Sequence, residues 1–261
     1  LFVCGLLFVK RVSTKGIRPW TVTLLANYWA AGVFSTLWLL GGEPINLQLL
    51  WQPALIAVLY ILGQVFTFTA IEHGDVSVAS PVFGAKVIFV ALLLAVVFGE
   101  SLSFADWTAD ALAAFGIALV QWNPQSHDHP AETRKVLLTI VLALLAGMSF
   151  ATFDVVVQNC APQWGPGRLI PISYWMVAVL SLGFLPLFQK RALSDVRLRN
   201  SILVGTLLIA MQALCIVYAI AAFGDAARVN VMYSMRGMWG VLLAWLVAII
   251  WGGNEAKQPT S

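Results

Sequence analysis

The chain has 261 residues, of which 60% are hydrophobic and 10% are charged, and its formal net charge is +3. Soluble domains carry about 25% charged residues and need a polar surface, so this composition excludes a soluble protein. No basic stripe or base-stacking module accompanies the small positive charge, which argues against a nucleic-acid partner. The composition therefore predicts an integral membrane protein that lies in a lipid bilayer.

Apolar stretches long enough to cross a bilayer recur along the whole chain. A helical span needs about 20 apolar residues, and these runs are continuous rather than alternating, which excludes a membrane β-barrel. We therefore predict an all-α membrane protein, a polytopic helical bundle of about nine helices. The expected spans are residues 1–9 (a partial span), 20–40, 51–71, 76–98, 105–122, 136–159, 169–188, 201–223 and 226–251.

The two halves of the chain resemble each other. Gly74-Asp75 aligns with Gly224-Asp225, and the same alignment places Lys86 opposite Arg236. The alignment predicts two five-helix repeats, the first truncated at its start and the second lacking the tenth helix. Because five is odd, the second repeat would be inverted in the membrane relative to the first. The expected domains are a first repeat at 1–122, a polar linker at 123–135 and a second repeat at 136–261.

Basic residues fall unevenly on the two sides of the predicted bundle. One side holds only Arg168 and Arg228 in its loops. Because loops rich in lysine and arginine stay in the cytoplasm, we expect the other side to be cytoplasmic. Its loop residues are Lys10, Arg11, Lys15, Arg18, Arg134, Lys135, Lys190, Arg191, Arg197, Arg199 and Lys257.

Lys86 and Arg236 lie near the centres of two predicted spans. An ammonium group at the centre of a bilayer costs at least about 2.5 kcal/mol, so such residues are rare and mark functional sites by default. One interpretation is an anion clamp, in which Arg236 binds a carboxylate or phosphate through two N–H groups and Lys86 adds a point charge. The alternative is structural, with each cation neutralised by a carboxylate such as Asp154.

Other polar residues in the spans are candidates to line a binding cavity. Tyr233 shares a helix face with Arg236 and could contact a ligand through its ring and hydroxyl. Asp154 could bind a proton or a sodium ion, or it could pair with one of the two cations. Three single amides either line the cavity or join helices through hydrogen bonds: Asn27, Gln64 and Gln212. Asn230 is a further candidate, in the pattern Asn230-x-x-x-Ser234, a bulkier counterpart of the small-residue pattern Ser80-x-x-x-Gly84.

No pattern for a cofactor, a metal or an intramembrane active site occurs in the chain. The three cysteines, Cys4, Cys160 and Cys215, stand alone without metal-binding spacing, and His127 and His129 lie in the polar linker. No glycine-rich nucleotide loop is present, which argues against direct use of ATP. We therefore expect neither a cofactor nor a metal, and no enzyme activity; an intramembrane enzyme and a non-transporting receptor or scaffold are the alternatives.

The chain resembles the drug/metabolite transporter superfamily, EamA-type. The resemblance rests on "YILGQVFTFTAIEHGDVSVASPVFGAKVIFVALLLAVVFGESLSFADW", with its Gly-Asp turn and Gly-Glu before the next span, and on the weaker repeat "YAIAAFGDAARVNVMYSMRGMWGVLLAWL". It implies ten helices in two inverted halves around a central cavity whose lining includes Lys86 and Arg236. It also implies transport of a small metabolite across a plasma (inner) membrane. Members are usually drawn with cytoplasmic termini, whereas the loop charges here favour an N-terminus outside.

These observations together predict a secondary transporter that works by alternating access. The expected substrate is a small anionic or zwitterionic metabolite, bound where the two halves meet near the middle of the membrane. Asp154 would couple transport to a proton or a sodium ion. The sequence specifies neither the oligomeric state nor the identity of the substrate.

Overall fold

The computed structural model describes residues 4, 5, 8, 15–73, 82–83, 85–120 and 130–234. This part of the chain holds nine α-helices, three 3-10 helices and no strand. The α-helices are α2 (Pro19–Phe34), α3 (Trp51–His73), α5 (Lys86–Val96), α6 (Phe104–Val120), α7 (Pro130–Trp164), α8 (Pro166–Leu180), α9 (Arg191–Ser194), α10 (Val196–Phe223) and α11 (Ala226–Ser234). The 3-10 helices are η1 (Ser35–Leu40), η2 (Leu47–Leu49) and η3 (Ser181–Leu187).

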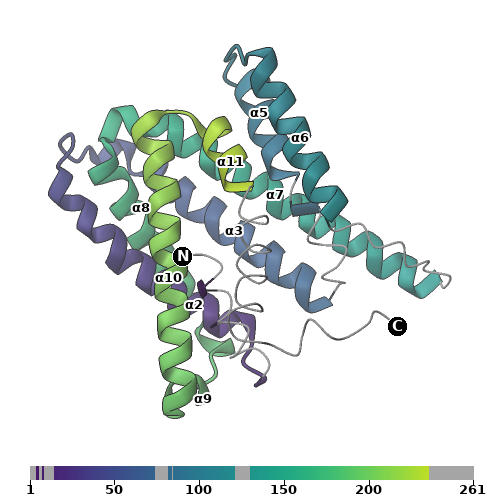
Figure 1. The fold of residues 1–261 in the computed structure, drawn as a ribbon. Helices are drawn as coiled ribbons and strands as arrows, with labels where there is room; N and C mark the ends of the chain where they lie inside the picture. Colours follow the sequence, from purple (N-terminus) through teal and green to yellow (C-terminus); the bar gives the residue numbers. More distant parts are fainter. Residues whose placement is uncertain are drawn as a thin grey trace, which may run out of the picture.

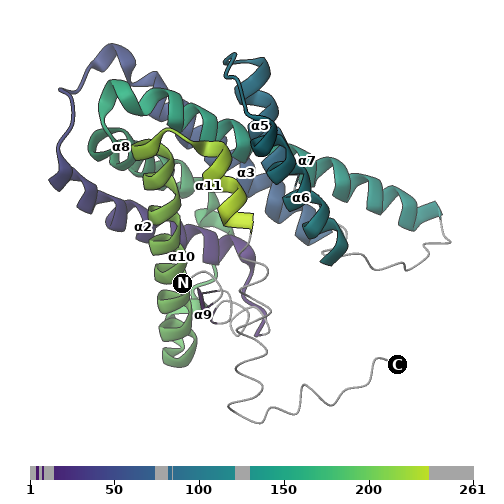
Figure 2. The ribbon, with the colours of Figure 1, turned by 45° about the horizontal axis from the view of Figure 1, so that its top comes forward.

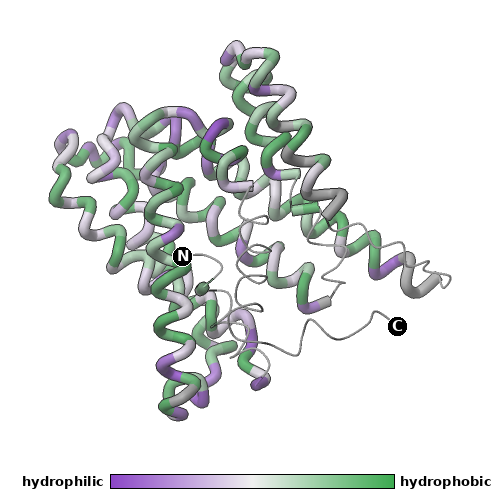
Figure 3. Tube along the Cα trace, in the orientation of Figure 1, coloured by the Kyte–Doolittle hydropathy of each residue, from purple (hydrophilic) through white to green (hydrophobic). Residues whose placement is uncertain are grey.

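Five helical segments of the described chain are long and apolar enough to cross a membrane, and a sixth, shorter apolar helix is α5. Along the Cα trace, hydrophobic residues make up most of the long helices, and many of the hydrophilic residues lie toward helix ends (Figure 3). This distribution confirms the predicted polytopic helical membrane protein. The five segments are Pro19–Leu40, Leu47–Glu72, Arg134–Trp164, Pro166–Leu187 and Leu198–Phe223.

The helices pack around α3 and α7, which lie against each other in the middle of the bundle (Figure 1). On one side of them lie α2, α8 and α10. On the other side stands the pair α5 and α6, and α11 lies between this pair and α10 (Figure 2). An aromatic cluster forms the core between the central helices and α2 and α8: the Tyr174 ring stacks on Phe34 with centroids 3.8 Å apart, and Tyr60 lies 5.3 Å from both Tyr174 and Phe153.

Two of the predicted spans change from α-helix to 3-10 helix near their ends. The change occurs at Ser35 in the first half and at Ser181 in the second half. Each serine hydroxyl donates a hydrogen bond to the carbonyl four residues back, which competes with the regular helical pattern. The two helices that the predicted repeat aligns thus share the same irregularity.

The hydrogen bonds between α2 and α8 show that these two helices run antiparallel. Asn27, in the middle of α2, donates to Ser181 at the end of α8, and Trp175, in the middle of α8, donates to Ser35 at the end of α2. Each helix therefore presents its mid-region to the end of the other, as a two-fold axis across both helices requires. This is the relation that the predicted inverted repeat expects of corresponding helices.

Loops that are predicted to lie on the same side of the membrane are in contact. On the basic side, the Arg18 backbone N–H donates to Gln189, and the Trp20 indole donates to Glu72. On the other side, the backbone N–H of Glu43 donates to the Trp164 carbonyl at 3.0 Å. These contacts agree with the predicted alternation of spans.

Some boundaries differ from the predictions. The first helix of the second half begins at Pro130 rather than at residue 136. The prediction began with the apolar residues, whereas the helix also includes the polar residues before them, because its backbone hydrogen bonds do not depend on an apolar sequence. The described part of span 76–98 has a turn at Ala85, so Lys86 is the first residue of α5 rather than the middle of one continuous helix. Pro81 and Gly84, the two weakest helix-forming residue types, precede this turn. Of the partial span 1–9, the described residues Cys4, Gly5 and Phe8 are helical.

Candidate functional site

Lys86 and Asp154 form an ion pair between the two halves of the chain. The Lys86 Nζ lies 2.6 Å from Asp154 Oδ2, and the Asp154 side chain is 3% exposed while that of Lys86 is 19% exposed. The pair therefore joins α5 to α7 within the apolar body of the protein. This is the pairing that the sequence left open as the alternative to a free cation. Arg236, the other member of the predicted clamp, lies outside the described residues.

The ion pair lies near the middle of the expected membrane thickness. Asp154 lies about 15 Å along α7 from the end of that helix at Trp164, at 1.5 Å per residue. The hydrocarbon core of a bilayer is about 30 Å thick, so this depth is about half of it. The Asp154 side chain is almost fully buried, so its charge depends on partners within the protein.

Asn230 of α11 completes this cluster. Its Nδ2 donates to Asp154 Oδ2 at 2.7 Å and to the Ala226 carbonyl at 2.8 Å. Its Oδ1 is buried and has no hydrogen-bond partner among the described residues. A buried acceptor without a partner costs about 1–3 kcal/mol, so such atoms are rare unless a ligand or water reaches them. The amide thus offers an acceptor beside the carboxylate that it holds.

Two aromatic rings flank the ammonium group of this cluster. Lys86 Nζ lies 6.0 Å from the centroid of Phe150 on α7 and 5.9 Å from that of Tyr233 on α11. These distances are at the outer limit of a cation–π contact. The Phe150 ring also packs on Gly63 of α3, where an added Cβ would lie 2.8 Å from the ring. The Lys86 site, defined here as Lys86, Asp154, Asn230, Phe150 and Tyr233, therefore draws on three helices.

The structure brings two other predicted residues together in a separate cluster. The side-chain amides of Asn27 and Gln64 exchange hydrogen bonds of 2.9 and 2.8 Å, and Asn27 also donates to Ser181 Oγ at 2.7 Å. All three side chains are buried between α2, α3 and η3. Since their donors and acceptors serve one another, this geometry favours the role of joining helices. The last predicted amide, Gln212, lies half-buried on α10.

A second polar bridge between the halves lies one helical turn beyond Asp154. The Gln158 side chain is 7% exposed; its Nε2 donates to Glu100 at 2.9 Å, and its Oε1 accepts from the backbone N–H of Ala226 at 2.7 Å. One amide thus ties the loop before α6 to the first residue of α11. In the sequence, Gln158 stands out only as a neighbour of Asp154 on the same helix face. Its position on that face was the only indication in the sequence that Gln158 bridges other segments.

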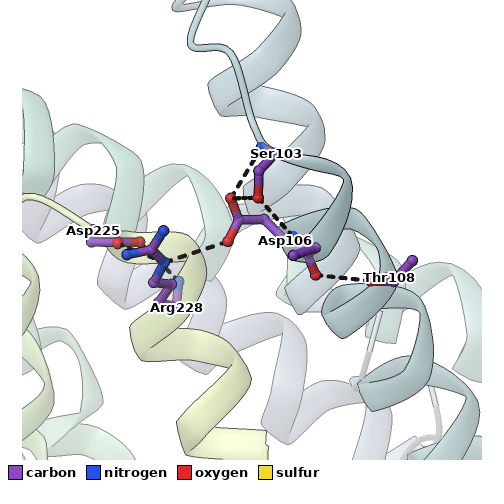
Figure 4. Close-up of polar contacts among 6 residues, drawn as sticks. Ser103, Asp106, Thr108, Asp225 and Arg228 are labelled. Atoms are coloured by element: carbon purple, nitrogen blue, oxygen red, sulfur yellow. Dashed lines mark hydrogen bonds and ion pairs between the residues drawn. The ribbon is translucent and has the colours of Figure 1, made fainter.

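A surface cluster of charges joins the same two segments (Figure 4). Arg228 Nε lies 3.4 Å from Asp106 Oδ1 on α6 and 3.4 Å from Asp225 Oδ2. Asp106 is held in place by Ser103, whose hydroxyl donates to its Oδ2 at 2.7 Å in a reciprocal helix cap. With Gln158, these residues form what we call the end contacts, which connect the halves on the less basic side.

Within the described part of the chain, no three histidine, cysteine or acidic side chains gather as a metal site would require. The linker histidines, His127 and His129, lie outside that part. The Lys86 site combines a cation, a carboxylate and an amide with one open acceptor, and it lies between the two halves of the chain beside two aromatic rings.

Comparison with known proteins agrees with this architecture. Residues 2–122 match the model of the EamA-like transporter family. One solved structure, described as "Crystal structure of protein", is similar in fold, with a TM-score of 0.69 and 15% sequence identity. The similarity covers 100% of this chain and 88% of that one. At this identity the likeness concerns the fold alone. No match was found among curated proteins.

Proposed function

This chain belongs to the EamA-like transporter family through residues 2–122, and on that premise we propose that it is a secondary transporter for a small anionic or zwitterionic metabolite. Family members are membrane transporters rather than enzymes, and the apolar helices agree with a multi-pass protein. We place it in the plasma (inner) membrane. The observation that carries the proposal is the buried Lys86–Asp154 ion pair between the two halves.

The chemistry of the Lys86 site suits a substrate that carries a negative group. A carboxylate or phosphate can displace Asp154 as the partner of the Lys86 ammonium, because both are oxyanions that accept charge-assisted hydrogen bonds. In a zwitterion, the positive group would then bind the open acceptor of Asn230. Tyr233 would contact the body of the substrate, and Arg236 would supply the second cation of the clamp.

Asp154 is also the residue that we propose to bind the coupling ion. Its carboxylate holds Lys86 in the structure at 2.6 Å. A proton on Asp154 would remove the negative charge that competes with an anionic substrate for Lys86. A sodium ion would act in the same direction by electrostatic repulsion of the ammonium. Either ion would thus favour substrate binding, which is the requirement for coupled movement in one direction.

In an alternating-access cycle, the substrate path through the membrane would open first at one end and then at the other. The end contacts join the α5–α6 segment to α11 on the less basic side, one turn from the ion pair. We propose that these contacts close the path on that side. Exposed ion pairs of this kind contribute little to stability because water screens them, so they can break and re-form during transport.

The test is uptake into proteoliposomes that contain the purified full chain, with a panel of organic anions and zwitterions and with imposed proton or sodium gradients. We expect saturable uptake that Lys86→Ala and Arg236→Ala each abolish, while Lys190→Ala, a substitution in a basic loop, leaves it unchanged. Uptake of every panel member at the rate of empty vesicles would contradict the proposal. A chemically altered substrate would indicate an enzyme, and saturable binding without flux would indicate a receptor or scaffold.

A further inference from the structure

An apolar groove lies on the outer face of the bundle, away from the Lys86 site. Its volume is about 500 Å³, and it is lined by Trp38 of η1, Ala54 and Val58 of α3, and the α8 residues Ile172, Trp175, Met176, Val179 and Leu180. No polar atom contributes to its surface. The α8 residues that face the opposite way, Ser173, Tyr174 and Val177, are buried in the core. The groove therefore faces outward, toward the surrounding lipid.

Arg168 stands at one end of this groove. It precedes Ile172, Trp175, Met176 and Val179 on the same stripe of α8, at helical spacing. Its guanidinium carbon lies 4.6 Å from the centroid of the Trp38 ring, which itself lines the groove. Among the described residues, no carboxylate forms an ion pair with Arg168. Arg168 is thus a cation that has no anionic partner among the described residues, and it lies beside the end of the apolar groove.

The position of Arg168 suits the headgroup level of a bilayer. It lies in the first turn of α8, and α8 opens a segment that is long and apolar enough to span the membrane. Tryptophan rings are enriched at this level, where their polar and apolar parts both find partners. The indole N–H of Trp175 donates to Ser35 Oγ at 2.9 Å, so its ring can face hydrocarbon without an unpaired donor.

We propose that this groove binds one anionic glycerophospholipid of the surrounding membrane. Its phosphate would receive hydrogen bonds from the Arg168 guanidinium, whose planar fork matches a phosphate. One acyl chain would lie along the groove from Ile172 to Leu180, a length of about 12 Å on the helix. Charge complementarity selects this occupant, because the choline group of a zwitterionic phosphatidylcholine would place a second positive charge near Arg168, whereas an anionic lipid brings none.

The test is native mass spectrometry of the purified full chain after incubation with phosphatidylglycerol or phosphatidylcholine. We expect one phosphatidylglycerol to be retained in preference to phosphatidylcholine, and Arg168→Gln to weaken that retention about tenfold, the usual effect of losing one charge-assisted pair. Arg191→Gln is the matched control, because Arg191 is exposed and lies on α9, outside the groove. Unchanged retention by Arg168→Gln would overturn the proposal.

A second variant tests the apolar part of the site. Val179 is 62% exposed, so Val179→Trp can fill the groove without disturbing the core. We expect this variant to fold and to lose the retained lipid, whatever the fate of Arg168→Gln. Retention equal to that of the unchanged chain would refute the groove as the acyl site. A dimer that forms with the unchanged chain and disappears with Val179→Trp would show that a second copy, rather than a lipid, covers this face.

Discussion

The Lys86–Asp154 pair allows structural and functional roles to be separated by measurement. Asp154→Leu would leave the Lys86 ammonium, whose side chain is 19% exposed, without a partner, and Lys86→Met would leave the carboxylate, which is 3% exposed, without its cation. Breaking a buried pair from one side typically costs about 3–5 kcal/mol. Replacing both partners by apolar side chains of similar volume is often neutral or stabilising by about 1–4 kcal/mol. We therefore expect both single variants to be unstable and the double variant to be close to the unchanged protein.

The assay is thermal unfolding of purified protein in detergent, followed by tryptophan fluorescence. For a chain of this size, about 3–5 kcal/mol corresponds to a fall of about 10 °C in the apparent midpoint. The double variant Lys86→Met with Asp154→Leu should recover most of that fall. If the two single effects simply add in the double variant, the pair is not coupled and the ion pair is refuted.

The same double variant then tests the proposed function. It should fold, yet it should not transport any anion or zwitterion, because both charged groups of the Lys86 site are gone. Transport at the normal rate by this variant would show that the pair only stabilises the fold. A loss of transport in a protein of normal stability would show the opposite, and it could not be explained by misfolding.

Three further predictions concern other parts of the molecule. Asn27→Ala should lower stability by about 1–3 kcal/mol, because Gln64 loses its partner within the core, and the same unfolding assay measures this. Gly167→Val should prevent normal packing, since even a Cβ at Gly167 would collide with the Gly41 carbonyl oxygen. Size-exclusion chromatography should then show the loss of a monodisperse peak. An unaffected peak would contradict the close approach of α8 to η1. Asp106→Asn should weaken its ion pair with Arg228 and so favour opening at the end contacts. A cysteine introduced at Tyr233 should then react faster with a water-soluble thiol reagent. An equal reaction rate would argue against a gate at the end contacts.

Several features of the site could be predicted from the sequence because they depend on single residues. A lysine inside an apolar run can be recognised from the sequence whichever way its side chain points, because the free-energy cost of placing an ammonium group in the membrane depends on that residue alone. Lys86 and Asp154 were candidates on this ground, whereas Tyr233 was a candidate because it shares a helix face with Arg236, and Asn230 because it is a polar residue of the same span. The structure brings these four together. Asn27 and Gln64 were predicted by the same reasoning, but they form a cluster of their own.

The partners of these residues could not be predicted in the same way. Lys86 and Arg236 were both possible partners of Asp154, and Gln158 gave little sign that it bridges Glu100 and the start of α11. Neither the groove nor the place of Arg168 beside Trp38 follows from composition or spacing. Each of these features depends on which faces of distant helices meet.

The membrane class, the approximate limits of the long apolar spans and the grouping of loops by side could be read from the amino-acid sequence alone. These follow from the transfer free energy of each apolar stretch and from the alternation of short connections, both of which are local properties. The folded arrangement was needed to show that Lys86 pairs with Asp154, that Asn27 pairs with Gln64, and that the α2 and α8 spans end in 3-10 helix. Apolar helices lie equally well beside many neighbours in lipid, so their few polar groups and close-packed faces select the arrangement, and that selection is made between helices rather than along one.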